Sequence, residues 1–169
     1  MIACVDVDYR DAGATAAALL FQDWSDEQPV EEIVIPIDRV EPYEPGQFYR
    51  RELPCLRAVL AAARTKPRII IIDGYVWLGD EQHPGLGAHL FAAMGREAAV
   101  IGVAKTKFVG AGLAEEVRRG TSQSPLYITA AGLEPAEAAR RIREMRGPFR
   151  IPTLLRRVDQ LCRGRVLRG

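Results

Sequence analysis

The sequence has few cysteines, no long apolar run and almost no net charge, and each of these absences argues against a class of protein. Cys4, Cys55 and Cys162 are its three cysteines, far apart and without a CxxC pair. That pattern argues against a disulfide framework or a cysteine zinc site and favours reduced thiols. The densest apolar stretch, at 68–73, holds four consecutive isoleucines, whereas a membrane span needs about 20 apolar residues. The N-terminus has no basic segment and no cleavage site, so we expect a cytoplasmic protein without a membrane partner.

The composition is that of an ordinary globular protein. Hydrophobic residues make up 48% of the 169 residues and charged residues 27%, which is typical of a folded chain and not of a disordered one. A chain of this length buries a sizeable core, and no repeat, low-complexity segment or linker divides it. We therefore expect one domain over residues 1–169, and a monomer.

The net charge of +1 hides a strong asymmetry along the chain. From Arg140 onward there are ten arginines against Glu144 and Asp159, a charge of +8, so residues 1–139 carry −7. An arginine-rich end suits a phosphate-backbone partner such as DNA or RNA. The solvated faces of two amphipathic helices would produce the same pattern, and the sequence alone does not choose between these interpretations.

The order of apolar patterns predicts an α/β fold. Residues 2–9, 14–21 and 33–37 have the character of strands, although the alanines of 14–21 also permit a helix, and Pro36 marks the third as an edge or bulged strand. Helical spacing follows over 48–64. Strands are then predicted at 68–73, 99–104 and 126–129, with helices at 85–95, 134–145 and 152–162. Strands first, then strands alternating with helices, indicate a mixed sheet with helices on its faces.

Three acidic residues fall where these elements would bring chemistry together. Asp6 lies on the first strand, Glu52 near the start of the first long helix, and Asp73 at the end of a strand expected to be buried on both faces. Magnesium binds such carboxylate oxygens, and two ions can promote phosphodiester hydrolysis. A carboxylate buried at a strand edge without a cation is costly, so Asp73, which we expect to be buried, needs an explanation. Singly, each acid has an ordinary explanation, and Asp8 shares the strand face of Asp6, so periodicity does not choose between them.

The segment 43–54, Tyr-Glu-Pro-Gly-Gln-Phe-Tyr-Arg-Arg-Glu-Leu-Pro, resembles the Tyr-x-Pro-Gly…Arg-Glu-x-Pro signature of endonuclease V, the deoxyinosine 3′ endonuclease. Further blocks resemble that family in the same order, at 5–9, 72–74, 101–105, 125–128 and 149–159. The resemblance implies a ribonuclease H-like fold, with three N-terminal antiparallel strands and then parallel strands, flanked by helices. It also implies metal-dependent hydrolysis of the phosphodiester 3′ to inosine in DNA or RNA.

The resemblance also implies roles for single residues. It favours Asp6 over Asp8, and it implies that Asp6, Glu52 and Asp73 hold Mg²⁺, with Mn²⁺ as a possible substitute. Asp159 is similar to a fourth metal-site group, although a salt bridge with Arg156 or Arg163 is an equal alternative. Lys105 matches an active-site lysine that faces the reacting phosphate as a point charge.

A second group of residues resembles the part of the family that handles the base. Tyr43, Pro45 and Gly46 match a wedge loop that fills the gap left when inosine leaves the stack. An ordinary Pro-Gly turn is the alternative for this loop. Gly74 would let the backbone approach the extruded base closely. Trp77, close after Asp73, is a better candidate for substrate contact than Trp24, which is expected to pack in or beside the core.

The sequence also departs from the family pattern. A His-Pro six residues after Asp73 is replaced by Gly79, with His83-Pro84 displaced and the acidic Asp80 and Glu81 where the family is basic. His89 matches a later family histidine, but helix packing explains it better. These departures support a second hypothesis, a catalytically weak or inactive nucleic-acid-binding module. A third hypothesis is a ribonuclease H-like nuclease without a preference for inosine.

Overall fold

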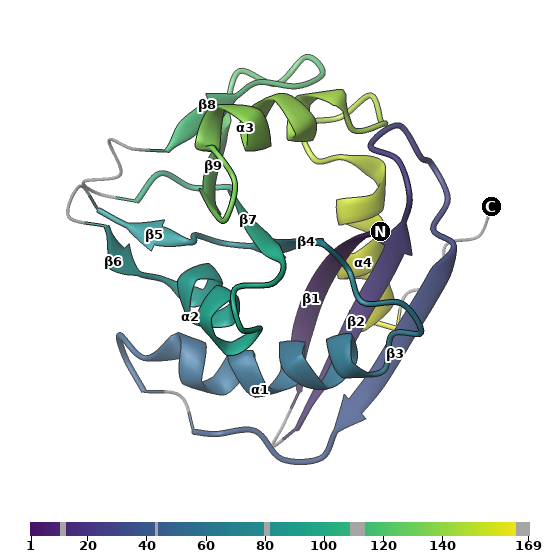
Figure 1. Cartoon of the computed structure of the whole chain (residues 1–169), viewed down its shortest axis with the longest axis vertical. Coiled ribbons are helices and arrows are strands. Elements are labelled where there is room, and N and C mark those ends of the chain that lie inside the picture. Colours follow the sequence, from purple (N-terminus) through teal and green to yellow (C-terminus); the bar gives the residue numbers. More distant parts are fainter. Residues whose placement is uncertain (11–12, 43, 80–81, 109–113, 165–169) are drawn as a thin grey trace.

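The computed structural model describes residues 1–10, 13–42, 44–79, 82–108 and 114–164, which form a mixed sheet with helices on both faces (Figure 1). The seven strands of the main sheet lie in the order β3-β2-β1-β4-β7-β9-β8. Their bounds are β1 Ile2–Arg10, β2 Gly13–Phe21, β3 Glu31–Ile37, β4 Ile69–Asp73, β7 Ala99–Ala104, β8 Glu115–Val117 and β9 Leu126–Ala131. A separate two-stranded ribbon pairs β5 (Trp77–Leu78) with β6 (His83–Pro84). The helices are α1 Phe48–Ala61, α2 Leu86–Ala93, α3 Pro135–Glu144 and α4 Thr153–Cys162.

The strand directions confirm the predicted fold class and add one feature to it. The first three strands are antiparallel, β4 runs parallel to β1, and β7 runs parallel to β4. The last two strands, however, form an antiparallel hairpin, and β9 also runs antiparallel to β7. The prediction of parallel strands in this part was therefore wrong for β9. The sequence did not reveal the hairpin because β8 is three residues long with two glutamates, and so has no apolar alternation.

The core consists of two layers, one on each face of the sheet. On one face, α1 and α2 pack their apolar side chains against Ile70 and Ile72 of β4. On the other, α3 and α4 pack against Ile71 and against Ile101 of β7. Successive strand residues point to opposite faces, so the isoleucine run of β4 serves both layers, as predicted for a strand buried on both sides. Each fully buried isoleucine or leucine contributes roughly 1.5–3 kcal/mol to stability.

Two smaller predictions, those for Pro36 and Trp24, are confirmed by this arrangement. Pro36 lies on β3, which is an edge strand, where its missing N–H leaves no gap in a central ladder. The three cysteines are free and buried. Trp24 packs at the edge of the core, edge-on to Phe21 with ring centroids 6.4 Å apart. Among the described helices there is none with the length and apolar character needed to cross a bilayer.

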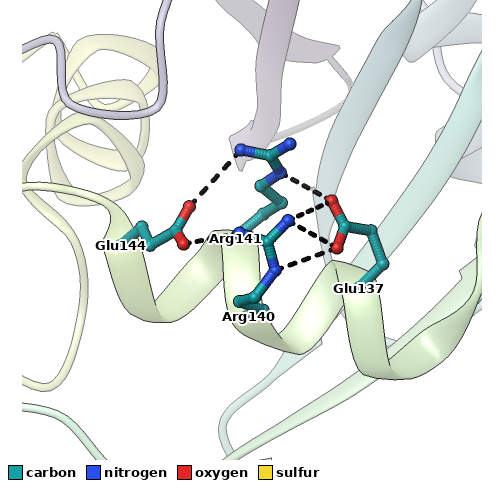
Figure 2. Close-up of polar contacts among 4 residues, drawn as sticks. All are labelled: Glu137, Arg140, Arg141 and Glu144. Carbon is teal, nitrogen blue, oxygen red and sulfur yellow. Dashed lines mark hydrogen bonds and ion pairs between the residues drawn. The ribbon is translucent and has the colours of Figure 1, made fainter.

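Much of the positive charge near the C-terminus is neutralised within the protein. On α3, Arg140 and Arg141 lie between Glu137 and Glu144, as Figure 2 shows, with Arg140 Nη2 2.6 Å from a Glu137 carboxylate oxygen. Arg157 of α4 pairs with Glu32 of β3 at 2.6 Å. For these arginines the structure supports the interpretation as solvated helix faces. Exposed ion pairs of this kind contribute about 0–1 kcal/mol each.

Candidate active site

The candidate site lies where β4 and β7 end beside the middle of β1, just past the last pair between β1 and β4. Val5 pairs with Ile72 in parallel register, so Asp6 and Asp73 are the next residues on two neighbouring strands. The carboxyl groups of both line a cavity of about 100 Å³, together with Lys105 and Asp159. Apolar side chains from the sheet and from α4 form the rest of its wall. The topology therefore gathers four of the charged residues that the sequence analysis named.

Asp73 is paired with a lysine and is not buried. Lys105 follows β7 two residues after Val103, the register partner of Asp73, and therefore points to the same face. Its Nζ lies 2.5 Å from Oδ2 of Asp73, and the two side chains are 44% and 40% exposed. The prediction that Asp73 is a buried carboxylate was thus wrong. Because β4 ends at this residue, its carboxyl group turns outward, and the ammonium supplies the counter-charge.

Glu52 is the buried carboxylate of the site. It is 7% exposed and belongs to α1. This helix covers the face of the sheet opposite α4, which lines the cavity. Burial raises the pKa of Glu52 to about 8, and the charges of Asp6 and Asp73 add to this effect. Near neutral pH the free protein therefore favours a proton on this side chain.

The pKa of Asp6 is also raised by burial, but less than that of Glu52. Burial raises the Asp6 pKa to about 6, while the Val7 N–H, which donates to Oδ1 at 2.8 Å, and the Lys105 charge oppose the rise. Asp73 and Asp159 raise the same pKa by repulsion.

No three His, Cys, Asp or Glu side chains of the described residues converge as a metal-binding cluster. The arrangement therefore suits an ion that takes one or two carboxylates and completes its shell with water and phosphate, which is typical of Mg²⁺.

Asp159 forms one of the expected salt bridges and also lines the cavity. It accepts a hydrogen bond from Nε of Arg163, four residues on, at 2.9 Å. It also lines the cavity, and its charge contributes to the raised pKa of Asp6. Asp8, in contrast, pairs with Arg10 at 2.8 Å and with Arg163 at 3.7 Å. The geometry thus favours Asp6 over Asp8 as the site residue of β1.

The residues expected to handle the base are described only in part. Tyr43 is outside the described residues. Pro45 and Gly46 are exposed in the connection before α1, where Gly46 has φ 78°. Gly74 has φ 112°, and no atom lies within 4 Å of the place where a Cβ would be. The backbone after Asp73 is therefore open to close approach by another molecule.

The segment after Asp73 crosses over β7 toward β9, a feature that sequence reasoning missed. A Cβ on Gly102 would lie 2.5 Å from the Gly74 carbonyl oxygen, so glycine is needed for this crossing. Val76 N–H donates to Oγ1 of the buried Thr129 at 2.8 Å. Trp77 donates its indole N–H to the Ala130 carbonyl at 2.9 Å, which anchors the side chain proposed to touch substrate. The one available sequence signal was a polar threonine within an apolar strand.

Tyr75 connects the same segment to the chain that follows Lys105. Its hydroxyl donates to the Thr106 carbonyl at 2.9 Å and accepts from the Phe108 N–H at 3.0 Å.

Neither of the two histidines lines the cavity. His89 stacks on Tyr49 of α1 with ring centroids 3.7 Å apart, which agrees with the helix-packing interpretation, and His83 lies exposed on β6. Asp80 and Glu81 are outside the described residues.

Comparisons with known proteins point to one family. The family model described as Endonuclease V matches residues 1–158. Endonuclease V of Thermus thermophilus is 30% identical, in an alignment covering 99% of this chain and 83% of that protein. The alignment with the Xylella fastidiosa enzyme, at 31% identity, covers 65% of this chain and spans less than half (45%) of the relative.

Solved structures show the same fold. The crystal structure of endonuclease V from Streptomyces avermitilis has a TM-score of 0.75 and 26% identity, covering 96% of this chain and 79% of that one. A Ciona intestinalis endonuclease V, in complex with a DNA that contains inosine, has a TM-score of 0.74 over 96% and 84% of the two chains. At 16% identity, it supports the fold alone. With its ribonuclease H-like sheet and a family match along almost its whole length, the chain belongs to the endonuclease V family.

Proposed function

We propose that this protein is a divalent-cation-dependent endonuclease that hydrolyses the phosphodiester bond 3′ to inosine. The observation that carries the proposal is the cavity lined by Asp6, Asp73, Lys105 and Asp159, with Glu52 buried beside it. Family membership supports the same activity, and the Ciona intestinalis relative binds DNA that contains inosine.

The residues present fit a magnesium ion. Asp6 and Glu52 both have pKa values raised by burial and by neighbouring carboxylates. A cation beside them favours their charged forms and offsets that repulsion. Asp6 and Asp73 would hold the principal ion, while Glu52 and Asp159 would orient water or a second ion. When bound, such an ion activates water and stabilises the charge that develops on phosphate.

The protein's own groups supply the remaining functions. The Lys105 ammonium lies in the same cavity and provides a positive point charge toward the phosphate. Gly74 would allow the extruded base to approach, and Pro45 and Gly46 would fill the gap that the base leaves. Removing a base from the stack costs a few kcal/mol, and less for a base that pairs weakly or lies in a single strand.

Cleavage of end-labelled single-stranded DNA and RNA tests the proposal directly. Each substrate carries one inosine, or guanosine at the same position, and is incubated with Mg²⁺, Mn²⁺ or EDTA. We expect a single cut 3′ to inosine, with 3′-hydroxyl and 5′-phosphate ends, in the presence of either metal and not in EDTA. Equal cleavage of the guanosine substrates would instead indicate a nuclease without inosine preference.

A second candidate function is nucleic-acid binding without turnover. It is favoured by one observation, that Gly79 stands where family members have a histidine. Intact substrates under both metals, together with binding that weakens as salt rises, would support this candidate over the nuclease.

Nucleic-acid binding under either function should depend on a few unpaired arginines. Arg118 and Arg143 are exposed in a surface groove with Arg146, and neither has an ion-pair partner among the described residues. We expect the double variant Arg118→Ala/Arg143→Ala to weaken binding and to flatten the plot of log Kobs against log salt by about 0.7–0.9 per lost phosphate contact. Fluorescence anisotropy between 50 and 300 mM salt (roughly the useful range) measures this slope.

Arg140→Ala is the matched control for that measurement, because Arg140 is already neutralised by Glu137 and Glu144 (Figure 2). Its slope should equal that of the unmodified protein. An unchanged slope in the double variant would show that Arg118 and Arg143 do not contact the phosphates of the nucleic acid.

A further inference from the structure

The side chain of Arg150 joins three segments that meet at the candidate site. Arg150 lies in the connection between α3 and α4, and its Nη2 donates to two backbone carbonyls. One is that of Pro125, just before β9, at 2.7 Å. The other is that of Lys105, just after β7. A single guanidinium therefore links the ends of two strands to the approach of α4.

The backbone that carries Arg150 is itself held by a buried arginine. Arg119, after β8, is 7% exposed, and its guanidinium lies among four carbonyls of the α3–α4 connection. It donates to Phe149 at 2.9 Å, to Gly147 at 3.3 Å and to Arg150 at 3.4 Å, and also to Met145. Because the planar guanidinium presents its donors in a fixed geometry, residues 145–150 are fixed relative to the sheet. Arg150 thus reaches Lys105 from a rigid support.

Lys105 needs such support because of its place in the chain. It lies one residue beyond the last paired position of β7, Ala104 with Tyr127. Its ammonium contacts Asp73 at 2.5 Å, while Arg150 donates to its carbonyl oxygen. The side chain is 44% exposed, so contacts with the surrounding protein hold it only in part. The position of its backbone then limits where the ammonium can lie.

We propose that Arg150 is a positioning residue, which fixes the Lys105 backbone and so keeps the Lys105 ammonium at Asp73 in the cavity. The catalytic consequence rests on the proposed function. Arg150 acts through Lys105, and its loss should slow the chemical step without weakening substrate binding. Displacing a reacting group by 1 Å reduces rates by up to about 100-fold.

Three variants test this inference in single-turnover cleavage of the inosine substrate, with affinity measured separately. Arg150→Met keeps the length of the side chain without donors and should lower the rate by about 10- to 100-fold, with a change in Kd below about threefold. Arg150→Lys retains a donor and should recover part of the rate. Arg140→Ala, whose partners are glutamates on α3 (Figure 2), should cleave normally. An unchanged rate in Arg150→Met, or a loss confined to Kd, would overturn the inference.

A spectroscopic measurement makes the test independent of activity. The chain has three lysines, Lys66, Lys105 and Lys107, so protein labelled with ¹³C at lysine Cε gives a simple spectrum, and Lys105→Arg identifies its signal. The two Cε protons of a held Lys105 should be inequivalent, and in Arg150→Met they should become equivalent while the other lysine signals stay unchanged. Thermal unfolding confirms that each variant is folded, and Arg150→Lys provides a milder comparison. An unaltered Lys105 signal in Arg150→Met rejects the inference, whereas absent cleavage by the unmodified protein rejects the proposed function alone.

Discussion

Asp6→Asn is expected to reduce cleavage by on the order of 10³-fold or more while leaving nucleic-acid affinity nearly unchanged. Asp6 lies in the cavity beside Asp73, Lys105 and Asp159, and its carboxylate is a proposed ligand of the principal cation. A neutral amide has one oxygen and no charge, and is therefore a poor ligand for a hard cation. The phosphate contacts that we expect to dominate affinity involve other residues, such as Arg118 and Arg143, and should remain intact.

Asp8→Asn provides a closely matched control. Asp8 is two residues farther along β1 and on the same strand face, but it pairs with Arg10 and Arg163. Its replacement should change the single-turnover rate by less than about twofold, since partly exposed ion pairs contribute little. Asp73→Asn, measured in parallel, should match Asp6→Asn. If Asp8→Asn lost activity and Asp6→Asn kept it, the assignment of the β1 ligand would be reversed.

Glu52→Gln should abolish cleavage and yet stabilise the metal-free protein at alkaline pH. The pKa of Glu52 is about 8 in the folded state against 4.5 for the unperturbed group. The folded state therefore binds this proton more tightly than the unfolded state, and stability falls as pH rises from about 4.5 to about 8. Glutamine removes that loss, so at pH 8 the variant should be more stable by about 2–4 kcal/mol, while at pH 4 the two proteins should be equal.

Urea unfolding in EDTA between pH 4 and pH 9 measures this difference. Glu115→Gln, an exposed position on β8, should follow the unmodified protein throughout. Adding Mg²⁺ at pH 8 should stabilise the unmodified protein more than Glu52→Gln, because a ligand that binds the folded state alone raises its stability. If Glu52→Gln were instead destabilised equally at pH 5 and pH 8, Glu52 would not be a buried carboxylate with a raised pKa.

Local patterns in the sequence were enough to predict most of the framework. The β-branched run 69–72 predicted β4, and the helical spacing after Phe48 predicted α1, because each pattern reflects which face of one element is buried. The motif around Glu52 indicated the family, which the match over residues 1–158 confirms. These features depend on neighbours in the chain, so the sequence alone determined them.

Other features depend on residues that are far apart in the chain, and only the tertiary structure decided them. The composition near the C-terminus does not reveal which arginines form ion pairs. Arg140 is neutralised and Arg143 is not, because pairing depends on which side chains face each other. The exposure of Asp73 and the burial of Glu52 follow from where β4 ends and from how α1 crosses the sheet. Likewise, Arg150 reaches the Lys105 carbonyl across 45 positions of sequence. Sequence patterns report the burial of single elements, whereas the pairing of charges and carbonyls is set when those elements pack.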